Sequence, residues 1–108
     1  MKKFDYRSYG VQDDNTVIPI PRFSCVDTAC ALHLKLRGEG ISSRIFSLSG
    51  AGISHQYVVP DDARGTDNAL NNRFGPTGDP YSPVLTVAYV RKHGEDMTDL
   101  YMEYWEDR

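Results

Sequence analysis

Apolar positions recur with helical spacing most clearly in the segment 25–37. Leu32 and Leu36 widen an apolar stripe whose members lie three or four residues apart. Ser24 and Asp27 form a variant of a helix capping box ahead of this stripe. Glycines directly after the last turn favour helix termination. We therefore predict a helix from Cys25 to Arg37. The spacing is carried by Val26, Ala29, Cys30, His33, Leu34 and Arg37.

Short runs of β-branched and aromatic residues follow this helix and are separated by turn-forming residues. Such runs are typical of strands, and clusters of Gly, Pro, Asn, Asp and Ser are typical of the connections between them. The pattern predicts strands at 41–48, 53–59, 66–70 (short) and 84–90, with connections at 49–52, 60–65 and 71–83.

The two ends of the chain have different patterns. Pro19 and Pro21 exclude a helix from the N-terminal segment, so we expect residues 1–22 to form an extended arm. The tail permits two structures, a helix or the second arm of a hairpin that turns at 93–96, and we favour the helix. The apolar tail residues at helical spacing are Met97, Leu100, Tyr101, Tyr104 and Trp105.

These elements predict a single α+β domain, in which the helix packs on a small antiparallel sheet. It would comprise the arm 1–22, the helix and strands of 23–70, the loop 71–83 and a C-terminal part 84–108. The 108 residues are 40% hydrophobic and 25% charged, which suits a folded domain with one core.

The charge and hydropathy of the chain argue against nucleic acid and membrane as partners. The formal net charge is -3 and no basic stripe is present, which argues against nucleic acid as a partner. The sequence contains no apolar run near the roughly 20 residues that span a bilayer, and no signal-peptide pattern. We therefore expect no membrane partner and a cytoplasmic location, with delivery into another cell as a further possibility. The two cysteines, Cys25 and Cys30, point to different helix faces and are expected to be thiols.

Cys25 is the leading candidate for chemistry because it is the first residue of the predicted helix. A helix N-terminus offers free backbone N–H groups and a partial positive charge, and both favour a thiolate. The same N–H groups could stabilise an oxyanion at a carbonyl carbon that the sulfur attacks.

Two further residues could complete a catalytic triad with Cys25. His55 follows a glycine turn at the head of a predicted strand, where its imidazole could accept and return the thiol proton. Asp67 lies near the start of the next segment, and a carboxylate there could fix the tautomer of the ring. We therefore predict Cys25, His55 and Asp67 as catalytic residues, with no cofactor and no metal.

This order of elements resembles the papain-like and transglutaminase-like cysteine enzymes. The resemblance covers residues 23–68, and its most family-like part is the Leu-Arg-x-x-Gly-Ile-x-x-Arg stretch from Leu36 to Arg44. Compact papain-like toxin domains of bacterial competition systems are the most similar in size. The resemblance implies a papain-like core in which the cysteine attacks an acyl carbon, the histidine is the base and the aspartate orients it.

Two departures from the family pattern stand beside one agreement. Tyr57 supplies the aromatic residue that transglutaminase-like proteins usually carry two positions after the histidine. Asn68 follows the aspartate where they tend to have proline. The upstream amide that papain-like enzymes use at the oxyanion has only Gln12 and Asn15 as candidates, neither in a supporting context.

Ordinary structural roles compete with each of these assignments. Cys25 could be a small buried apolar residue, and Cys30 is expected in the core. His33 shares a helix face with Cys30, but a satisfied core or surface histidine is expected rather than a metal ligand. His55 could be a surface residue at a strand end, and His93 is expected to be exposed.

Two functions of different classes follow. The first is a cysteine-dependent acyl-transfer enzyme, a peptidase, amidase or glutamine deamidase, acting on a protein or peptide. The second is a small non-enzymatic binding or inhibitor protein, of the phage or toxin–immunity type, which would hold a cognate protein partner with an acidic, aromatic C-terminal surface.

Overall fold

The computed structural model describes residues 25–50, 53–71 and 83–106. In chain order the elements are α1 (Cys25–Gly38), β1 (Ser43–Gly50), β2 (Ile53–Pro60), β3 (Leu70–Asn71), α2 (Val87–His93), β4 (Glu95–Asp96) and α3 (Thr98–Glu106). Within these ranges, none of the helices has the length and apolar character needed to cross a membrane.

The sheet is antiparallel throughout and has the strand order β3-β2-β1-β4. Its centre is the hairpin of β1 and β2, paired without interruption from Ser43 opposite Pro60 to Gly50 opposite Ile53. The outer strands β3 and β4 each contribute two residues. The continuous register fixes which side chains share a face, because successive residues of a strand point to opposite sides.

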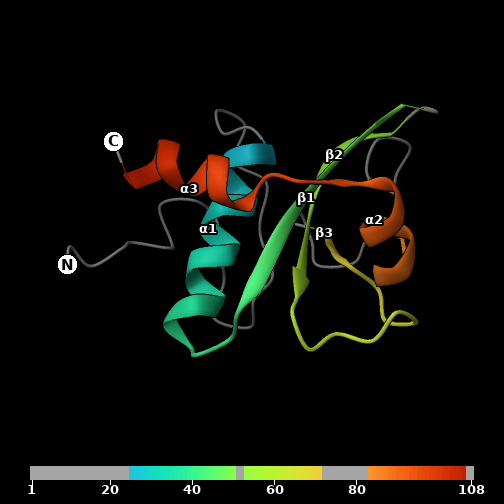
Figure 1. Ribbon diagram of the computed structural model, residues 1–108, viewed down its shortest axis with the longest axis horizontal. Helices are drawn as coiled ribbons and strands as arrows, with labels where there is room; N and C mark the ends of the chain where they lie inside the picture. Colours follow the sequence, from blue (N-terminus) through green and yellow to red (C-terminus); the bar gives the residue numbers. More distant parts are fainter. Residues whose placement is uncertain (1–24, 51–52, 72–82, 107–108) are drawn as a thin grey trace.

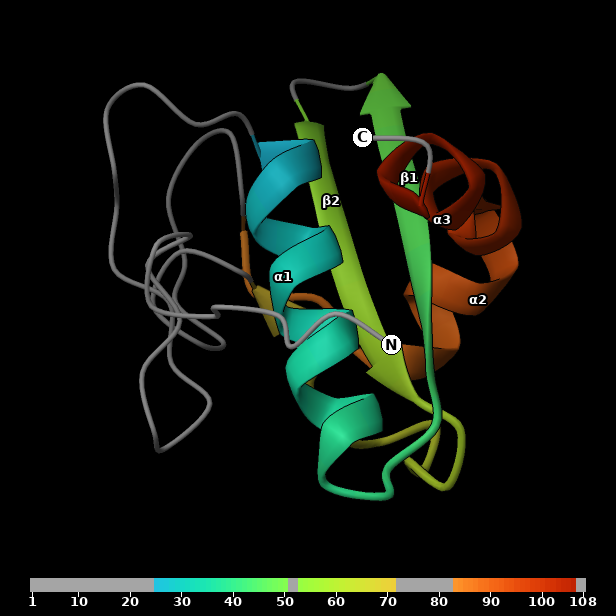
Figure 2. The same cartoon turned by 90° about the vertical axis from the view of Figure 1, so that its left-hand side faces the viewer.

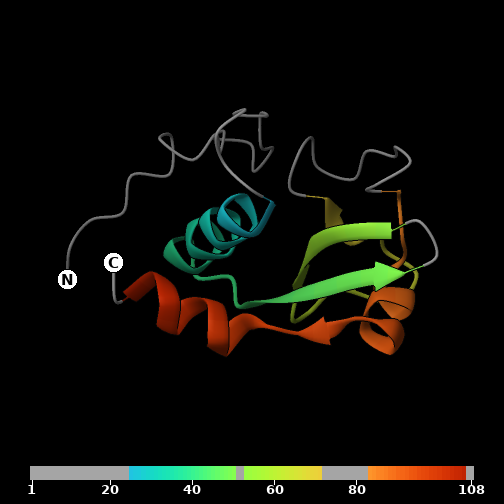
Figure 3. The same cartoon turned by 90° about the horizontal axis from the view of Figure 1, so that it is seen from above.

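Helices cover both faces of this sheet, with α1 and α3 on one face and α2 on the other (Figures 1 and 3). On the α1 face, Ile45 and Val58 pack with the helix residues Ala29, Cys30 and Leu32. On the α2 face a second apolar cluster forms from Leu48, Tyr57, Val59, Ala69, Val87 and Val90. The molecule is therefore a three-layer α+β domain whose core is divided by the sheet.

The predicted helix and the two central strands are confirmed. The helix ends at Gly38, one residue beyond the prediction, and β2 covers the predicted 53–59 with Pro60 added. The first strand lies two residues later than the predicted 41–48. That shift arises because Glu39 and Gly40 continue the helix end as a turn, with the Ile41 N–H donating to the Leu36 carbonyl at 2.9 Å.

The strand predicted at 84–90 is wrong, because this segment contains most of a helix. Thr86 caps α2 by accepting a hydrogen bond from the Tyr89 N–H, and Gly94 follows its last residue. Val87 and Val90 are fully buried and lie three residues apart, which is helical spacing. Strand propensity was therefore overridden by capping and by the burial of one helix face.

The tail is helical, as favoured. Met102 is buried in the α3–α1 contact, and Tyr101 and Trp105 pack against the same cluster. The preceding residues Glu95 and Asp96 pair with Ser47 and Phe46 of β1 instead of forming a turn.

The remaining predicted segments are covered only in part. The short strand expected at 66–70 is reduced to β3, which begins at Leu70, with an isolated bridge from Asn68 to Thr86. The arm 1–22, residues 51–52 of the first turn and most of the loop 71–83 lie outside the described residues.

Candidate functional site

Cys25 is the first residue of α1, as predicted, and its side chain lies outside the described part of the structure. The N-terminal end of α1 lies at the same end of the domain as the start of β2 (Figure 2). The backbone therefore brings the Cys25 end of the helix toward the strand that carries His55. The catalytic role of Cys25 stays a prediction.

The side chain of His55 lies on the sheet face opposite α1. Val58 faces α1, so the alternation of the strand turns His55, Tyr57 and Val59 to the other face. The His55 ring packs edge-on against the Tyr57 ring, with 5.3 Å between centroids, and the residue is 5% exposed. Tyr57 in turn donates a hydrogen bond to the Pro83 carbonyl at 2.7 Å.

Asp67 lies toward the other end of the domain. Its carboxylate is exposed and accepts a hydrogen bond from the Arg64 N–H at 2.8 Å. Because Val58 pairs with Leu70, Asp67 lies beyond the Pro60 end of β2. His55 is five residues before that end, about 17 Å along an extended strand. The structure therefore does not bring Asp67 to His55.

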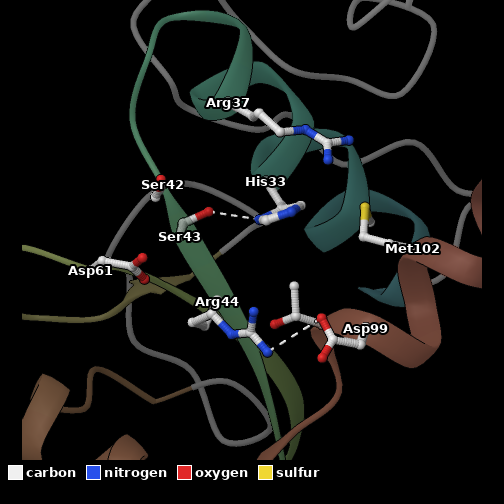
Figure 4. A pocket seen from close by; sticks show the side chains of 9 residues that line it. His33, Arg37, Ser42, Ser43, Arg44, Asp61, Asp99 and Met102 are labelled. Atoms are coloured by element: carbon white, nitrogen blue, oxygen red, sulfur yellow. Dashed lines mark hydrogen bonds and ion pairs between the residues drawn. The ribbon is translucent and has the colours of Figure 1, made fainter.

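A different group of polar side chains surrounds an open pocket of about 300 Å³ between the C-terminal half of α1, the start of β1 and α3 (Figure 4). The end of α1, the start of β1, Asp61 just after β2, and α3 contribute to its wall. The lining residues are His33, Arg37, Ser42, Ser43, Arg44, Asp61, Thr98, Asp99 and Met102.

His33 is held in this pocket by a buried hydrogen bond of 2.8 Å between its Nδ1 and the Ser43 hydroxyl. The two residues are 6% and 3% exposed. Burial, followed by the nearby positive charges of Arg37 and Arg44, lowers the pKa of His33 to about 4. The ring is therefore neutral at pH 7, and its Nε2 points away from Ser43 (Figure 4). The expectation that His33 is a satisfied histidine is confirmed.

Arg44 forms the lower wall of the pocket as part of an ionic network. Its Nε donates to Asp96 Oδ2 at 2.8 Å, and its Nη2 lies 3.5 Å from Asp99 Oδ1. The hydrogen bond to Asp96 is the main reason that the pKa of Arg44 is raised. Burial acts to raise the pKa of Asp96, but hydrogen bonds from Arg44 and Thr98 outweigh it and lower that pKa.

Arg37 and Asp61 are the other charged residues of the wall. Within the described residues, neither charged group takes part in a hydrogen bond or ion pair, and both residues are exposed. Arg37 lowers and Asp61 raises the pKa of His33, which places both within electrostatic reach of the ring. In Figure 4 they lie on opposite sides of the hydrogen-bonded His33 and Ser43.

Only some of the pocket residues could have been predicted to lie together from the sequence pattern. His33 and Arg37 are four residues apart on a helix and must share a face, which was a usable signal. Asp61 belongs to an ordinary turn after β2 and reaches the pocket only because β2 pairs with β1, where Pro60 lies opposite Ser43.

Metal binding has no support from the described residues, since they contain no group of three or more His, Cys, Asp or Glu side chains placed to hold an ion. A scan against protein-family models, a search of curated proteins and a search of solved structures each found no match to the chain.

Proposed function

We propose that this protein is a small binding protein that receives a polar ligand of low molecular mass, or a short peptide, in the pocket between α1, β1 and α3. One observation carries the proposal: a pocket of about 300 Å³ is lined by polar groups, of which His33 and Ser43 are fixed by burial and by their mutual hydrogen bond. Ligand pockets in proteins begin at roughly this size and use a few well-placed polar groups to orient the ligand.

His33 is better suited to holding a ligand than to catalysis, and Ser43 to fixing the His33 ring. A general base works best when its pKa is close to the working pH, and the pKa of His33 is about 4. The Ser43 hydroxyl belongs to a residue that is only 3% exposed, which leaves little access for an acyl carbon. Binding is therefore the activity that these contacts support.

The proposal is tested by blocking the pocket. A mixture of polar metabolite-sized compounds and short peptides is screened by ligand-observed NMR, and hits are mapped on the ¹⁵N-labelled protein. We expect shifts at the amides of Ser42, Ser43 and Asp99, and we expect Ser42→Phe to abolish them. Ser49→Phe, at an exposed position at the other end of β1, is the matched control. Hits that map elsewhere, or that survive Ser42→Phe, would refute the proposal.

A second candidate, the cysteine-dependent acyl-transfer enzyme with a papain-like core, is supported by the position of Cys25 at the start of α1. The helix N-terminus favours its thiolate. The arrangement lacks an imidazole directed from β2 toward α1, because the His55 ring packs on Tyr57 on the other face. Any base for the Cys25 thiol would therefore have to come from another residue or from rotation of that ring.

The rate of thiol alkylation as a function of pH tests the second candidate. In a Cys30→Ala background, a catalytic Cys25 is expected to react with iodoacetamide with a midpoint at least one pH unit below about 8.5, the ordinary value for a free thiol. Hydrolysis of peptide or glutamine substrates should be lost in Cys25→Ala. An ordinary midpoint together with no activity in the unmodified protein would eliminate this candidate.

A further inference from the structure

We propose that the pocket takes a dipolar ligand, whose anionic group lies against Arg37 and whose cationic group lies against Asp61. A short peptide with both termini charged belongs to this class. The proposal rests on the proposed binding function and specifies the chemistry of the ligand.

The balance of charge on the wall is the first argument. Four charged side chains line the pocket, two arginines and two aspartates. Arg44 is already paired with Asp96 and Asp99, in a group of one positive and two negative charges. Arg37 and Asp61 remain, one of each sign, and neither has an ionic partner among the described residues. A simple anion would be attracted by Arg37 and repelled by Asp61, and a simple cation would meet the reverse.

The neutral ring of His33 is the second argument. It lies between the two free charges and responds to both, since Arg37 lowers and Asp61 raises its pKa. At pH 7 the ring adds no charge of its own, so Arg37 and Asp61 are, among the described residues, the unpaired charges beside it. Its Nδ1 is occupied by Ser43, which leaves Nε2 to make a hydrogen bond to the ligand between the two charged groups.

The size of the pocket is the third argument. A space of about 300 Å³ is at the lower end of the range for ligand sites. It suits a compound with the mass of a di- or tripeptide. The wall is open to solvent, so a ligand of this size could hold a charged group at each side without burying either charge completely.

The experiment compares four probes with one backbone: triglycine, N-acetyl-triglycine, triglycinamide and N-acetyl-triglycinamide. These carry both charges, the negative charge only, the positive charge only and no charge. Binding is followed at pH 7 and low salt through the amides of Ser42, Ser43 and Asp99. We expect triglycine to bind at least tenfold more tightly than either singly charged probe.

Two variants identify the partner of each charge. Arg37→Gln should reduce the affinity for triglycine to that for triglycinamide, because the carboxylate loses its partner. Asp61→Asn should reduce it to that for N-acetyl-triglycine. Asp62→Asn, at the neighbouring exposed carboxylate, and Lys92→Gln, on α2 across the sheet, are the matched controls and should leave affinity unchanged.

The outcomes separate this inference from the function on which it rests. Equal affinity for all four probes, tighter binding of a singly charged probe, or no binding of triglycine would each overturn the dipolar class. The binding function itself stands or falls on the Ser42→Phe screen, whatever the charge of its hits. A loss of triglycine binding in Asp62→Asn would also refute the assignment to Asp61.

Discussion

At the scale of single residues, His33 is the most informative side chain. It lies in a helix whose residues Thr28 to His33 are all buried, yet it carries two polar nitrogens. Ser43 satisfies one of them, and the pocket receives the other. Burial and the charges of Arg37 and Arg44 make the neutral ring the stable form. The residue therefore links α1 to β1 and makes the stability of the fold depend on pH.

We predict that His33 makes the protein less stable as the pH falls from 6.5 to 4. In this window the unfolded ring, with its ordinary pKa of 6.5, binds a proton that the folded ring, with a pKa of about 4, does not. Protonation therefore favours the unfolded state, and the free energy of unfolding should fall by about 1 to 3 kcal/mol. Urea denaturation at several pH values measures this.

Variants isolate the contribution of His33. In His33→Gln, the free energy of unfolding should change little between pH 4 and 6.5. In His93→Gln, which replaces an exposed histidine, it should fall with pH as in the unmodified protein. The lowered pKa of Asp96 acts mainly below its ordinary value of 3.8 and so affects only the acid end of this window. An equally steep dependence in His33→Gln would show that His33 is not its source.

At the scale of elements, the junction of β1, β4 and α3 depends on one hydroxyl group. Thr98 Oγ1 accepts the Ile45 N–H at 2.7 Å and donates to Asp96 Oδ1 at 2.7 Å. The Met97 N–H donates to the Ile45 carbonyl at 2.8 Å. Because β4 has only two residues, these bonds replace much of the ladder that a longer strand would form. They also position Asp96 to hold Arg44 at the pocket wall.

We predict that Thr98→Val destabilises the protein by about 1 to 3 kcal/mol, because it preserves shape but leaves the Ile45 N–H buried without an acceptor. Thr98→Ser keeps the hydroxyl and should lower the free energy of unfolding by less. Thr66→Val, at an exposed position between β2 and β3, is the neutral control. Thermal or urea unfolding measures the stability of all three variants. If Thr98→Val lowers the free energy of unfolding by no more than Thr66→Val does, the role of the hydroxyl is refuted.

At the scale of the whole molecule, the β1–β2 hairpin separates two apolar clusters. One contains Cys30 and Leu32 of α1, and the other contains Val87 and Val90 of α2. Among the residues that the structure describes, both helices pack on this one sheet, so each cluster depends on the same pair of strands. We infer that the two halves of the core unfold together, as small single domains usually do.

Cys30 provides a probe of this cooperativity, because it is fully buried. In a Cys25→Ser background, we predict that a thiol reagent modifies Cys30 only through global unfolding. The protection of Cys30 should then give the same free energy as urea denaturation followed by circular dichroism. Protection that is smaller by more than about 1 kcal/mol would show that α1 separates locally from the sheet.

The central elements were predictable because their signals are local. The spacing of Ala29, Cys30 and Leu36 marked α1, and β-branched runs on either side of a glycine turn marked β1 and β2. The segment that became α2 was missed because its strand-forming composition competes with a cap at Thr86 that fixes a helical first turn. The predicted triad depended on contacts between distant segments, which composition cannot supply.

The sequence by itself determined the α+β class, the helix at Cys25 and the central hairpin, since spacing and turn chemistry act within a few residues of one another. The tertiary structure alone decided which side chains meet. The uninterrupted β1–β2 register turned His55 toward α2 and placed Asp67 beyond the far end of β2. The same pairing carried Asp61 to His33 and Arg37, because a sheet joins residues by register and not by their separation along the chain.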